Sequence, residues 1–461
     1  MGKNWNQNSW KEKKGIQMPV YADAKLLEDT INELATMPPL VTSWEIEKLR
    51  DKFALAEKGE VFVLQGGDCA ESFIECTSDF IVNKLKVLLQ MSLVLSVGLK
   101  KPIVRIGRMA GQYAKPRSAD TETRDGVTLP SYRGDIINGI EFTEKAREPN
   151  PVLMLRGYEK AALVMNFVRA LTEGGFADLH HPENWNIDFV KGSPMSREYE
   201  RILATAQNSL QFFETITQEA RSMHRVSFFS SHEGLHLPYE AAQTRFLKHR
   251  NYWYNLSTHF PWIGFRTTNL DEAHIEYFRG IRNPVGVKVG TSTDPDKLKG
   301  LIETLNPDNQ SGRLVFIARF GADQVETGLP TLIQTVKDLG ANVTWISDPM
   351  HGNTETSSNG YKTRSFDKIS KEIQLSLQIH QDLGSHLGGV HLELSGDNVT
   401  ECIGGASGIS EADLSKAYKT QVDPRLNYEQ SIEIAMMISN NFNRSEEHTS
   451  ELQSPCNLVC R

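Results

Sequence analysis

Cysteine is scarce in this chain, and its scarcity argues against a fold held together by disulfides. Only 5 of the 461 residues are cysteines, and those in the body of the chain, Cys69, Cys76 and Cys402, are widely separated. An odd, scattered set of this kind is not a disulfide framework. We therefore expect a protein of a reducing compartment, the cytoplasm.

The chain also lacks an excess of positive charge and a long apolar run. Its net charge is −8, so we expect no nucleic-acid partner, and any anionic ligand must be bound by a local cluster of cations. Residues 2–15 are polar and rich in lysine, which argues against a secretory signal. The longest apolar run, Val87–Leu99, contains Gln90 and is shorter than the roughly 20 residues that span a bilayer. We expect a buried helix there and no membrane partner.

What the chain does have is a regular alternation of strand and helix patterns. Its length accommodates a barrel of about 250 residues with additions, and 39% hydrophobic and 23% charged residues are typical of a globular protein. Alternation of this kind predicts a (β/α)8 TIM barrel in the α/β class. The predicted strands are Val61–Gln65, Ile103–Gly107, Arg225–Phe229, Trp262–Phe265, Val285–Val289, Leu314–Ala318, Val343–Ser347 and Val390–Leu394.

A residue suited to catalysis or anion binding stands at the C-terminal end of every predicted strand. In a TIM barrel these ends surround one mouth, where the chemistry takes place. The pattern therefore predicts an enzyme. The residues, in chain order, are Cys69, Arg108, Glu233, Arg266, Lys288, Arg319, His351 and Glu393.

The predicted barrel occupies residues 61–443 and carries two helical additions. An N-terminal extension, residues 1–60, contains helical patterns at Ala24–Thr36 and Ser43–Ala56, with Thr42 and Glu45 as a capping box for the second. Roughly 115 residues separate the second and third strands, far more than a simple crossover needs. We expect a helical insertion there at about 150–222, which is either a subunit interface, a regulatory pocket or an ornamental bundle.

Two helices are expected within this insertion. The helical patterns cover Leu153–Thr172 and Ser196–Thr217.

Residues 444–461 are rich in Ser, Glu and Asn and have no periodicity. We expect this tail to be disordered, and it resembles translated vector sequence.

Residues remote in sequence could form a metal site at the predicted mouth. A thiolate, an imidazole and two carboxylates form a set of intermediate softness, suited to Mn²⁺, Fe²⁺, Co²⁺ or Zn²⁺. Each residue alone is more simply explained as structural. Their shared placement near strand ends favours the metal site, with Cys69, His351, Glu393 and Asp423 as ligands.

A second group of residues is suited to anion capture. The loop of Lys115, Arg117 and Ser118 is stiffened by Pro116, although by itself a charged loop is usually a solvated surface. Lys288 and Arg319 adjoin apolar strands, where an unpaired cation is costly. With Arg108 and Arg266, they predict a site for two or more anionic groups such as phosphate or carboxylate.

His232-Glu233-Gly234-Leu235-His236 matches the pattern of zinc peptidases. That chemistry requires both histidines on one face of a helix. Gly234, Pro238 and the preceding strand pattern oppose a helix. We favour Glu233 as part of the barrel mouth and keep the peptidase as a remote alternative.

Four segments of the chain carry long and specific motifs: Gln65–Glu71, Arg108–Ser118, Asp348–Asn353 and Asp423–Asn427. They resemble those of the type II 3-deoxy-D-arabino-heptulosonate 7-phosphate (DAHP) synthases, and the likeness extends from near the N-terminus to about Asn443. The resemblance implies a metal-dependent, aldol-type condensation of phosphoenolpyruvate with erythrose 4-phosphate and water, giving DAHP and phosphate, the first step of the shikimate pathway. It also implies a homodimer or homotetramer and feedback regulation by an aromatic amino acid.

The resemblance also implies roles for individual residues. The metal, for which Mn²⁺ is the first expectation and Co²⁺, Fe²⁺ or Zn²⁺ are alternatives, would be held by Cys69, His351, Glu393 and Asp423. Lys288 and His351 would also act in the chemical step. Phosphoenolpyruvate would be bound by Arg108, Glu233, Phe265, Arg266, Lys288 and Arg319, and erythrose 4-phosphate by Lys115, Arg117 and Ser118.

Phe265 departs from the family pattern, which usually has an acidic residue there. If the position serves phosphate through its backbone N–H, phenylalanine is tolerated; if a carboxylate must orient Lys288 or a water, activity falls. We predict only a modest loss. The alternatives are a non-catalytic relative that regulates another pathway enzyme and a synthase that uses another aldose phosphate.

Overall fold

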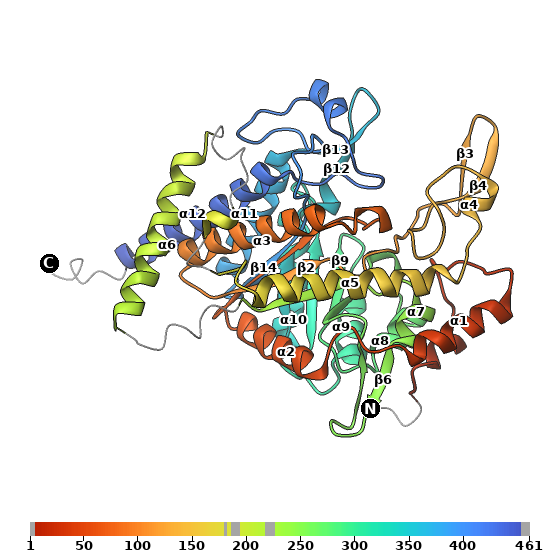
Figure 1. Cartoon of the computed structure of the whole chain (residues 1–461). Helices are drawn as coiled ribbons and strands as arrows, with labels where there is room; N and C mark the ends of the chain where they lie inside the picture. Colours follow the sequence, from red (N-terminus) through yellow and green to blue (C-terminus); the bar gives the residue numbers. More distant parts are fainter. Residues whose placement is uncertain (1–4, 179–181, 186–193, 217–225, 453–461) are drawn as a thin grey trace, which may run out of the picture.

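The computed structural model describes residues 5–178, 182–185, 194–216 and 226–452. Its centre is a closed barrel of eight strands in the order β1-β14-β11-β10-β9-β8-β5-β2 (Figure 1). Every neighbouring pair is parallel, which confirms the predicted (β/α)8 architecture. The barrel strands are β1 (Phe62–Gly67), β2 (Ile103–Arg108), β5 (Phe228–Glu233), β8 (Phe260–Ile263), β9 (Val285–Gly290), β10 (Leu314–Arg319), β11 (Thr344–Ser347) and β14 (Leu387–Glu393).

The third and fourth strands are displaced from the predicted ranges. β5 ends at Glu233, four residues beyond the predicted end at Phe229, and Arg225 lies outside the described residues. The prediction followed the apolar run and so stopped too early. The second half of β5 is polar and is paired inside the barrel. Ser231 Oγ donates to the carbonyl oxygen of Gly107 at 3.0 Å and accepts from Gln65 Nε2 at 3.0 Å. β8 ends at Ile263, so Phe265 begins the short 3₁₀ turn η6 (Phe265–Thr267).

Helices surround the barrel and follow its strands in the order that the alternation predicts (Figure 1). Between β5 and β8 the connection also contains a hairpin of β6 (Thr244–Leu247) and β7 (Tyr252–Asn255). The helices that follow barrel strands are α3 (Ser78–Leu99), α7 (Leu237–Ala242), α8 (Ala273–Phe278), α9 (Pro295–Leu305), α10 (Val325–Asp338), α11 (Phe366–Asp382) and α12 (Tyr428–Leu452).

α3 is the only helix among the described residues that is long and apolar enough to cross a membrane. However, 67% of its most apolar window is buried inside the structure. It packs against α12, and Leu88, Val94 and Leu95 share a core cluster with Ile434 of that helix. As predicted for Val87–Leu99, the apolar run is a buried helix of the barrel.

The N-terminal extension closes one end of the barrel. It contains α1 (Ala24–Thr36) and α2 (Ser43–Glu57), and Thr42 and Glu45 form a capping box at the start of α2. Leu49 and Phe53 of α2 are fully buried in a cluster with the side chains that fill the barrel interior. These contacts cover the N-terminal ends of the strands, so the opposite end is the open mouth.

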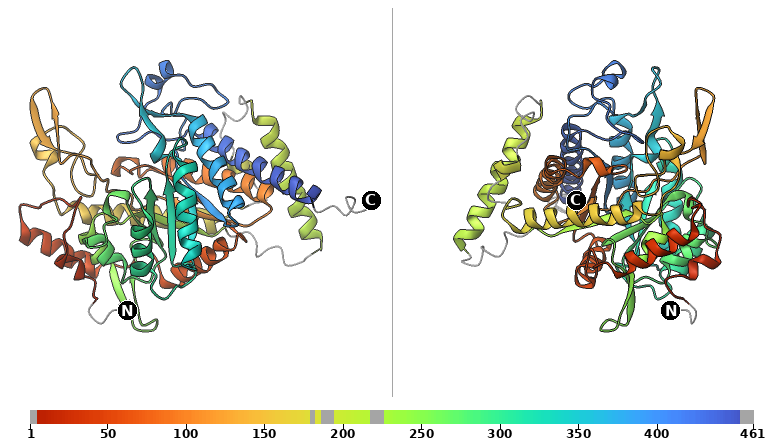
Figure 2. Two further views of the ribbon diagram at one scale, coloured as in Figure 1. Left: turned by 180° about the vertical axis from the view of Figure 1, so that it is seen from behind. Right: turned by 45° about the vertical axis from the view of Figure 1, so that its right-hand side comes forward.

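The long connection after β2 contains α5 (Leu153–Glu173) and α6 (Ser196–Ile216), close to the helical patterns read from the sequence. α6 lies on the outside of the barrel beside α3 (Figure 2), where Tyr199 and Ile202 are buried. Residues 217–222 of the expected insertion lie outside the described residues. The connection also forms a hairpin of β3 (Thr121–Arg124) and β4 (Val127–Pro130) and the short α4 (Glu144–Arg147), which the sequence did not predict.

The last helix runs into the segment 444–461, whose disorder stays a prediction. α12 continues to Leu452, beyond Arg444, where the predicted tail begins. Between Tyr428 and Pro455 the sequence contains no glycine or proline, so nothing in its composition stops a helix at residue 444. Residues 453–461 lie outside the described residues.

Candidate active site

The residues predicted from the strand ends gather at the open mouth of the barrel. Arg108, Glu233, Arg319 and Glu393 are the last residues of their strands, and Lys288 lies inside β9. A single pocket brings together most of the predicted side chains, and Glu393 lies against it through contacts with His351 and Arg108. The pocket is lined by Cys69, Arg108, Gln112, Lys115, Pro116, Glu233, Trp262, Gly264, Phe265, Arg266, Lys288, Arg319, His351 and Asp423.

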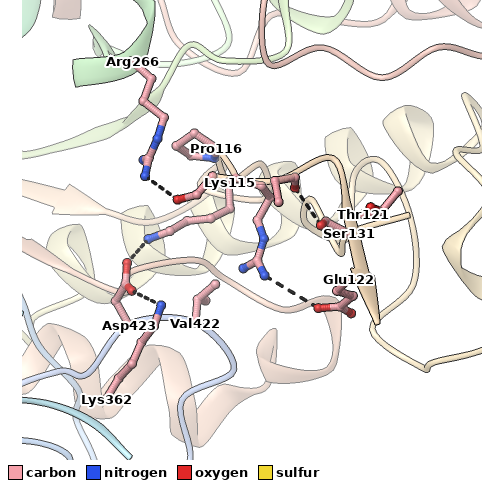
Figure 3. A pocket seen from close by; sticks show the side chains of 12 residues that line it. Lys115, Pro116, Thr121, Glu122, Ser131, Arg266, Lys362, Val422 and Asp423 are labelled. Carbon is pink, nitrogen blue, oxygen red and sulfur yellow. Dashed lines mark hydrogen bonds and ion pairs between the residues drawn. The ribbon is translucent and has the colours of Figure 1, made fainter. Parts of the chain in front are cut away.

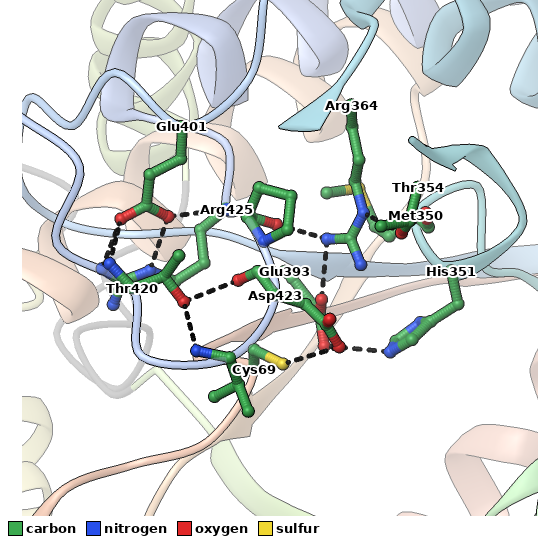
Figure 4. A network of polar contacts seen from close by, with 12 residues as sticks. Cys69, Met350, His351, Thr354, Arg364, Glu393, Glu401, Thr420, Asp423 and Arg425 are labelled. Carbon is green, nitrogen blue, oxygen red and sulfur yellow. Dashed lines mark hydrogen bonds and ion pairs between the residues drawn. The ribbon is translucent and has the colours of Figure 1, made fainter. Parts of the chain in front are cut away.

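Three of the four predicted metal ligands form one cluster, and the fourth, His351, contacts one of them. The donor atoms of Cys69, Glu393 and Asp423 all lie within 4.8 Å of one another. Cys69 Sγ is 3.5 Å from Asp423 Oδ2, and His351 Nε2 is 3.1 Å from Glu393 Oε1 (Figure 4). A thiol and two carboxylates thus cluster, with an imidazole in contact with one of the carboxylates, and this donor set fits a divalent cation of intermediate softness.

Lys115 reaches into the same cluster. Its Nζ donates to Cys69 Sγ at 2.5 Å and to Asp423 Oδ2 at 2.6 Å. Burial by itself lowers the pKa of Lys115, but Cys69 and Asp423 outweigh burial and raise it above its usual value. Burial raises the pKa of the Cys69 thiol. The ammonium group therefore supplies positive charge directly beside the candidate metal ligands.

Two buried guanidinium groups hold Glu393. Arg108 Nη2 donates to Glu393 Oε1 at 2.9 Å, and Arg364 Nη1 donates to Oε2 at 2.7 Å. Burial alone raises the pKa of Glu393, but His351, Arg364 and Arg108 outweigh it and hold the pKa well below its usual range. Glu393 is consequently a carboxylate with a fixed orientation. Arg364 is the last residue of strand β13 (Lys362–Arg364). This strand is not part of the barrel, so the pattern of strand ends did not point to Arg364.

Asp348 links the candidate metal site to the anion site. Its Oδ2 contacts Lys288 Nζ and lies 2.8 Å from His351 Nδ1. Burial lowers the pKa of Lys288 to about 8, with Asp348 opposing the shift. The neighbouring His351 and Lys288 side chains hold the pKa of Asp348 well below its usual range despite burial. Asp348 thereby orients the imidazole so that Nε2 faces Glu393.

A second pocket adjoins the first on the side of the Lys115 loop (Figure 3). Arg266 Nη2 donates to Ser118 Oγ at 2.9 Å, and Lys362 Nζ lies 3.3 Å from Asp423 Oδ1. Arg117 is partly paired with Glu122 at 3.8 Å. The pocket is rich in cations and shares Lys115, Pro116, Arg266 and Asp423 with the first one. Two neighbouring anionic groups can therefore be accommodated.

The loop that carries Asp423 is tied down by a buried ion network (Figure 4). Arg425 donates to Glu401 Oε1 at 2.9 Å and to Asp68 Oδ1 at 2.9 Å. Glu401 also accepts the backbone N–H of Thr420 at 2.8 Å, and Thr420 Oγ1 donates to the carbonyl oxygen of Asp423 at 2.8 Å. Since Asp68 precedes Cys69, one network fixes two of the candidate ligands.

Phe265 lies against the guanidinium group of Arg319. The guanidinium carbon is 4.8 Å from the centroid of the ring, a cation–π contact. Arg319 Nη2 donates to the carbonyl oxygen of His351 at 3.0 Å, and among the described residues Arg319 makes no ion pair. A neutral ring thus positions Arg319 without neutralising it.

The zinc-peptidase alternative does not fit the geometry. His232 and Glu233 belong to strand β5, whereas His236 precedes α7, so the two histidines do not share a helix. His232 Nε2 is 2.8 Å from Glu240 Oε1, and His236 Nε2 is 2.9 Å from the hydroxyl of Tyr21. Each imidazole has a structural partner of its own.

Several residues of the site were not assigned a role from the sequence. Asp348 could have been found, because a metal-binding histidine usually donates to a carboxylate and Asp348 lies in the same turn as His351. Arg364 and Lys362 gave no signal, because a charged hairpin looks like solvated surface. His391, buried beside Arg108 and hydrogen-bonded to Gln65 Oε1 at 2.7 Å, lies in an otherwise apolar strand.

Comparisons with known proteins identify the family. The model of the "Class-II DAHP synthetase family" matches residues 5–439. A phospho-2-dehydro-3-deoxyheptonate aldolase of Streptomyces coelicolor is 48% identical over 432 residues, covering 94% of this chain and 96% of that protein. A protein of the same name from Neurospora crassa is 45% identical over 466 residues, covering 97% and 96%.

Among solved structures, a phospho-2-dehydro-3-deoxyheptonate aldolase from Francisella tularensis covers 94% of this chain and 98% of its own, with 14% identity and a TM-score of 0.45. A likeness of that size carries no argument, and the barrel is established by the strand pairing of the chain itself. The family match spans nearly the whole chain, and so do both sequence relatives. The chain belongs to the class-II DAHP synthetase family.

Proposed function

We propose that this protein condenses phosphoenolpyruvate with D-erythrose 4-phosphate and water to give DAHP and phosphate, the entry step of the shikimate pathway. One observation carries the proposal: a thiol and two carboxylates cluster, with an imidazole against one of the carboxylates, beside a group of cations at the mouth of a barrel. Family membership and the names of the relatives support the same reaction.

Cys69, His351, Glu393 and Asp423 would hold the divalent cation, for which we propose Mn²⁺, with Co²⁺, Fe²⁺ or Zn²⁺ as alternatives. Glu393 and Asp423 are ready to bind it, because neighbouring cations keep the pKa of each carboxyl group far below its usual range against the opposing effect of burial. When bound, the cation supplies Lewis acidity that polarises the aldehyde of the sugar.

Arg108, Arg266, Lys288 and Arg319 would bind the carboxylate and phosphate of phosphoenolpyruvate, together with the backbone N–H of Phe265. Guanidinium groups suit this task because they bind such anions through two parallel hydrogen bonds. Lys115, Arg117 and Ser118 would bind the phosphate of the sugar in the neighbouring pocket. Lys115 faces both pockets, so it would lie between the two substrates.

In the reaction, C3 of phosphoenolpyruvate forms a bond to the aldehyde carbon, and the aldehyde oxygen takes up a proton. The cationic centre left at C2 takes up water, which gives up a proton and so balances the one taken up by the aldehyde oxygen. The resulting phosphohemiketal then breaks the bond from C2 to the phosphate oxygen, releasing phosphate and leaving the ketone of DAHP. Lys288, whose Nζ contacts Asp348, is our candidate for proton transfer. His351 contacts Asp348 through Nδ1 and would bind the cation through Nε2, so its part in the step would be to hold the cation.

Glu233 is our candidate to hold the water. Burial raises the pKa of its carboxyl group. Its Oε1 is buried and has no hydrogen-bond partner among the described residues, and the side chain lines the pocket. A buried acceptor without a partner is satisfied when a water molecule donates to it.

The assay is loss of phosphoenolpyruvate and appearance of DAHP with erythrose 4-phosphate, with and without EDTA and added Mn²⁺. Turnover that requires both the sugar and the ion supports the proposal. No turnover with any of the four metals would instead favour a regulatory relative, and turnover with other aldose phosphates at equal rates would favour a broader synthase.

The remaining expectations are proposals with their own tests. The insertion that contains α5 and α6 is proposed as the place of subunit contact, giving a homodimer or homotetramer, and of feedback by an aromatic amino acid. Light scattering measures the first, and a titration with Trp or Phe that leaves the rate unchanged removes the second. The cytoplasm is proposed as the compartment from the scarcity of cysteine.

A further inference from the structure

Glu372 on α11 is a buried carboxylate with no contact to the substrate pockets. It is only 1% exposed. Its Oε1 accepts the backbone N–H groups of Phe320 and Gly321, each at 3.0 Å, and its Oε2 accepts Asn353 Nδ2 at 2.7 Å. Phe320 and Gly321 follow β10, whereas Asn353 follows β11. One carboxylate therefore joins the loops after two neighbouring barrel strands.

Asn353 continues this connection from the other side. Its Oδ1 accepts the backbone N–H of Ala322 at 2.9 Å, and its Nδ2 also donates to the carbonyl oxygen of Pro349 at 2.7 Å. The two loops are in direct contact, since a Cβ on Gly321 would lie 2.7 Å from the carbonyl oxygen of Gly352. Gly321 has a φ of +87°, which a residue with a side chain rarely adopts.

Each of these loops carries a functional side chain next to the joint. Arg319, proposed to bind phosphoenolpyruvate, directly precedes Phe320. His351, proposed to bind the metal, lies two residues before Asn353. The two are themselves linked, because Arg319 Nη2 donates to the carbonyl oxygen of His351 at 3.0 Å. The spacing between anion site and metal site therefore depends on how the loops are joined.

We propose that Glu372 is a positioning residue that, through Asn353, fixes the metal ligand His351 and the anion-binding Arg319 relative to each other. The proposal rests on the function proposed above for these two side chains. Burial raises the pKa of Glu372 to about 7, so at pH 8 the group is mostly the carboxylate that can accept all three hydrogen bonds.

Glu372→Gln is the informative change. The amide oxygen can still accept the two backbone N–H groups of Phe320 and Gly321. The amide nitrogen then faces Asn353 Nδ2, so two donors meet where a donor met an acceptor. Asn353 cannot simply rotate, because its Oδ1 is held by Ala322 N–H. The second loop should therefore shift away from the first.

Glu57→Gln is the matched control. Glu57, at the end of α2, accepts the backbone N–H of Gly312 at 2.7 Å. It thus holds the loop that precedes β10, at the closed end of the barrel, in the same way as Glu372 holds the loop that follows β10. A change in stability that does not reach the site should appear equally in both variants.

The first measurement is Mn²⁺ affinity by calorimetry at pH 8 without substrates, and the second is KM for phosphoenolpyruvate. In Glu372→Gln we expect the Kd for Mn²⁺ and this KM each to rise by about tenfold or more, as when partners of metal ligands are lost. Glu57→Gln should change neither by more than about twofold. Adding Asn353→Asp to Glu372→Gln turns the donor at residue 353 into an acceptor for the new amide. Because this change also removes the hydrogen bond to the carbonyl oxygen of Pro349, only part of the Mn²⁺ affinity should return.

Unchanged Mn²⁺ affinity and KM in a folded Glu372→Gln variant would overturn the proposal, as would equal losses in Glu57→Gln. If Glu372→Gln does not fold, Glu372→Asp tests the positioning role of residue 372. This variant keeps the charge but draws the carboxylate back from the two loops, and unchanged Mn²⁺ affinity would reject the positioning role. The wild type could bind Mn²⁺ and make no DAHP, while Glu372→Gln binds the ion more weakly. That result rejects the proposed reaction and supports the positioning role of Glu372.

Discussion

Replacing Asp348 with asparagine tests the link between the two halves of the site. Asp348 Oδ1 accepts the backbone N–H groups of Met350 at 3.0 Å and His351 at 3.2 Å, which an asparagine oxygen can still do. Oδ2 contacts Lys288 Nζ and His351 Nδ1. In Asp348→Asn an amide N–H₂ replaces Oδ2, and it meets an ammonium group and an imidazole N–H. The fold keeps its turn, but Lys288 loses its acceptor, and His351 keeps only the longer contact from Nδ1 to Oδ1, at 3.1 Å.

Two effects of known size follow. Loss of the carboxylate behind a metal-binding histidine weakens metal binding or activity by about 10–100-fold, which is roughly 1.4–2.7 kcal/mol. Asp348 also opposes the burial effect that lowers the pKa of Lys288 to about 8. Without Asp348 this pKa falls further, so Lys288 loses its proton at lower pH. The decline of kcat/KM for phosphoenolpyruvate at high pH should therefore move to lower pH in the variant.

The measurements are a Mn²⁺ titration followed by calorimetry and a pH profile of kcat/KM from pH 6 to 10 as a practical range. Asp338→Asn is the control, since Asp338 is an exposed carboxylate at the end of α10 and its loss changes the net charge equally. If Asp348→Asn binds Mn²⁺ as tightly as the wild type and keeps the same pH profile, Asp348 neither orients His351 nor sets the charge of Lys288.

Three further predictions concern single residues of the site. Cys69→Ser should weaken Mn²⁺ binding by about tenfold or more and leave the circular dichroism spectrum intact; a fully active variant rules out the ligand role. In the wild type, kcat/KM for phosphoenolpyruvate should fall as the pH rises through about 8, because Lys288 loses its charge there. In Lys288→Arg the charge persists and the fall should disappear, so an unchanged profile assigns the titration elsewhere. Phe265→Glu should change kcat/KM by less than about tenfold. In the wild type the ring of Phe265 already positions Arg319, so a carboxylate in its place has little to add. A gain of orders of magnitude would show that the usual acidic residue is needed.

The sequence could predict the barrel because its signals are local. Apolar and β-branched runs mark strands wherever a parallel sheet is buried on both faces, and the order of the strands in the closed barrel follows from handedness and short connections. The prediction was wrong about the end of β5, where polar residues such as Ser231 are paired inside the barrel, and about β8, which starts two residues earlier and ends at Ile263. An apolar run cannot reveal a hydrogen bond between strands that are distant in sequence.

The candidate site could be predicted in part for a similar reason. A barrel assembles whatever stands at the ends of its strands, so Cys69, His351 and Glu393 could be grouped before their distances were known. Arg364, which holds Glu393 at 2.7 Å, and Glu372 lie on a hairpin and a helix outside this rule. Their contacts depend on loop packing in three dimensions, which neither periodicity nor composition encodes.

The two ends of this barrel should respond differently to mutation. Phe53 of α2 is fully buried among the side chains that fill the barrel at its closed end, 4.8 Å from the ring of Phe260. Truncation of such a ring leaves a cavity and costs about 3–5 kcal/mol. Phe53→Ala should therefore unfold at lower urea concentration while kcat/KM and Mn²⁺ affinity of the folded protein, measured well below its melting temperature, stay unchanged. The destabilised variant should keep its function because rigid strands separate the filled interior of the barrel from the mouth. A Phe53→Ala variant that loses Mn²⁺ affinity while still folded would mean that the two ends are coupled through the strands, and the site could not then be treated as a property of the loops alone.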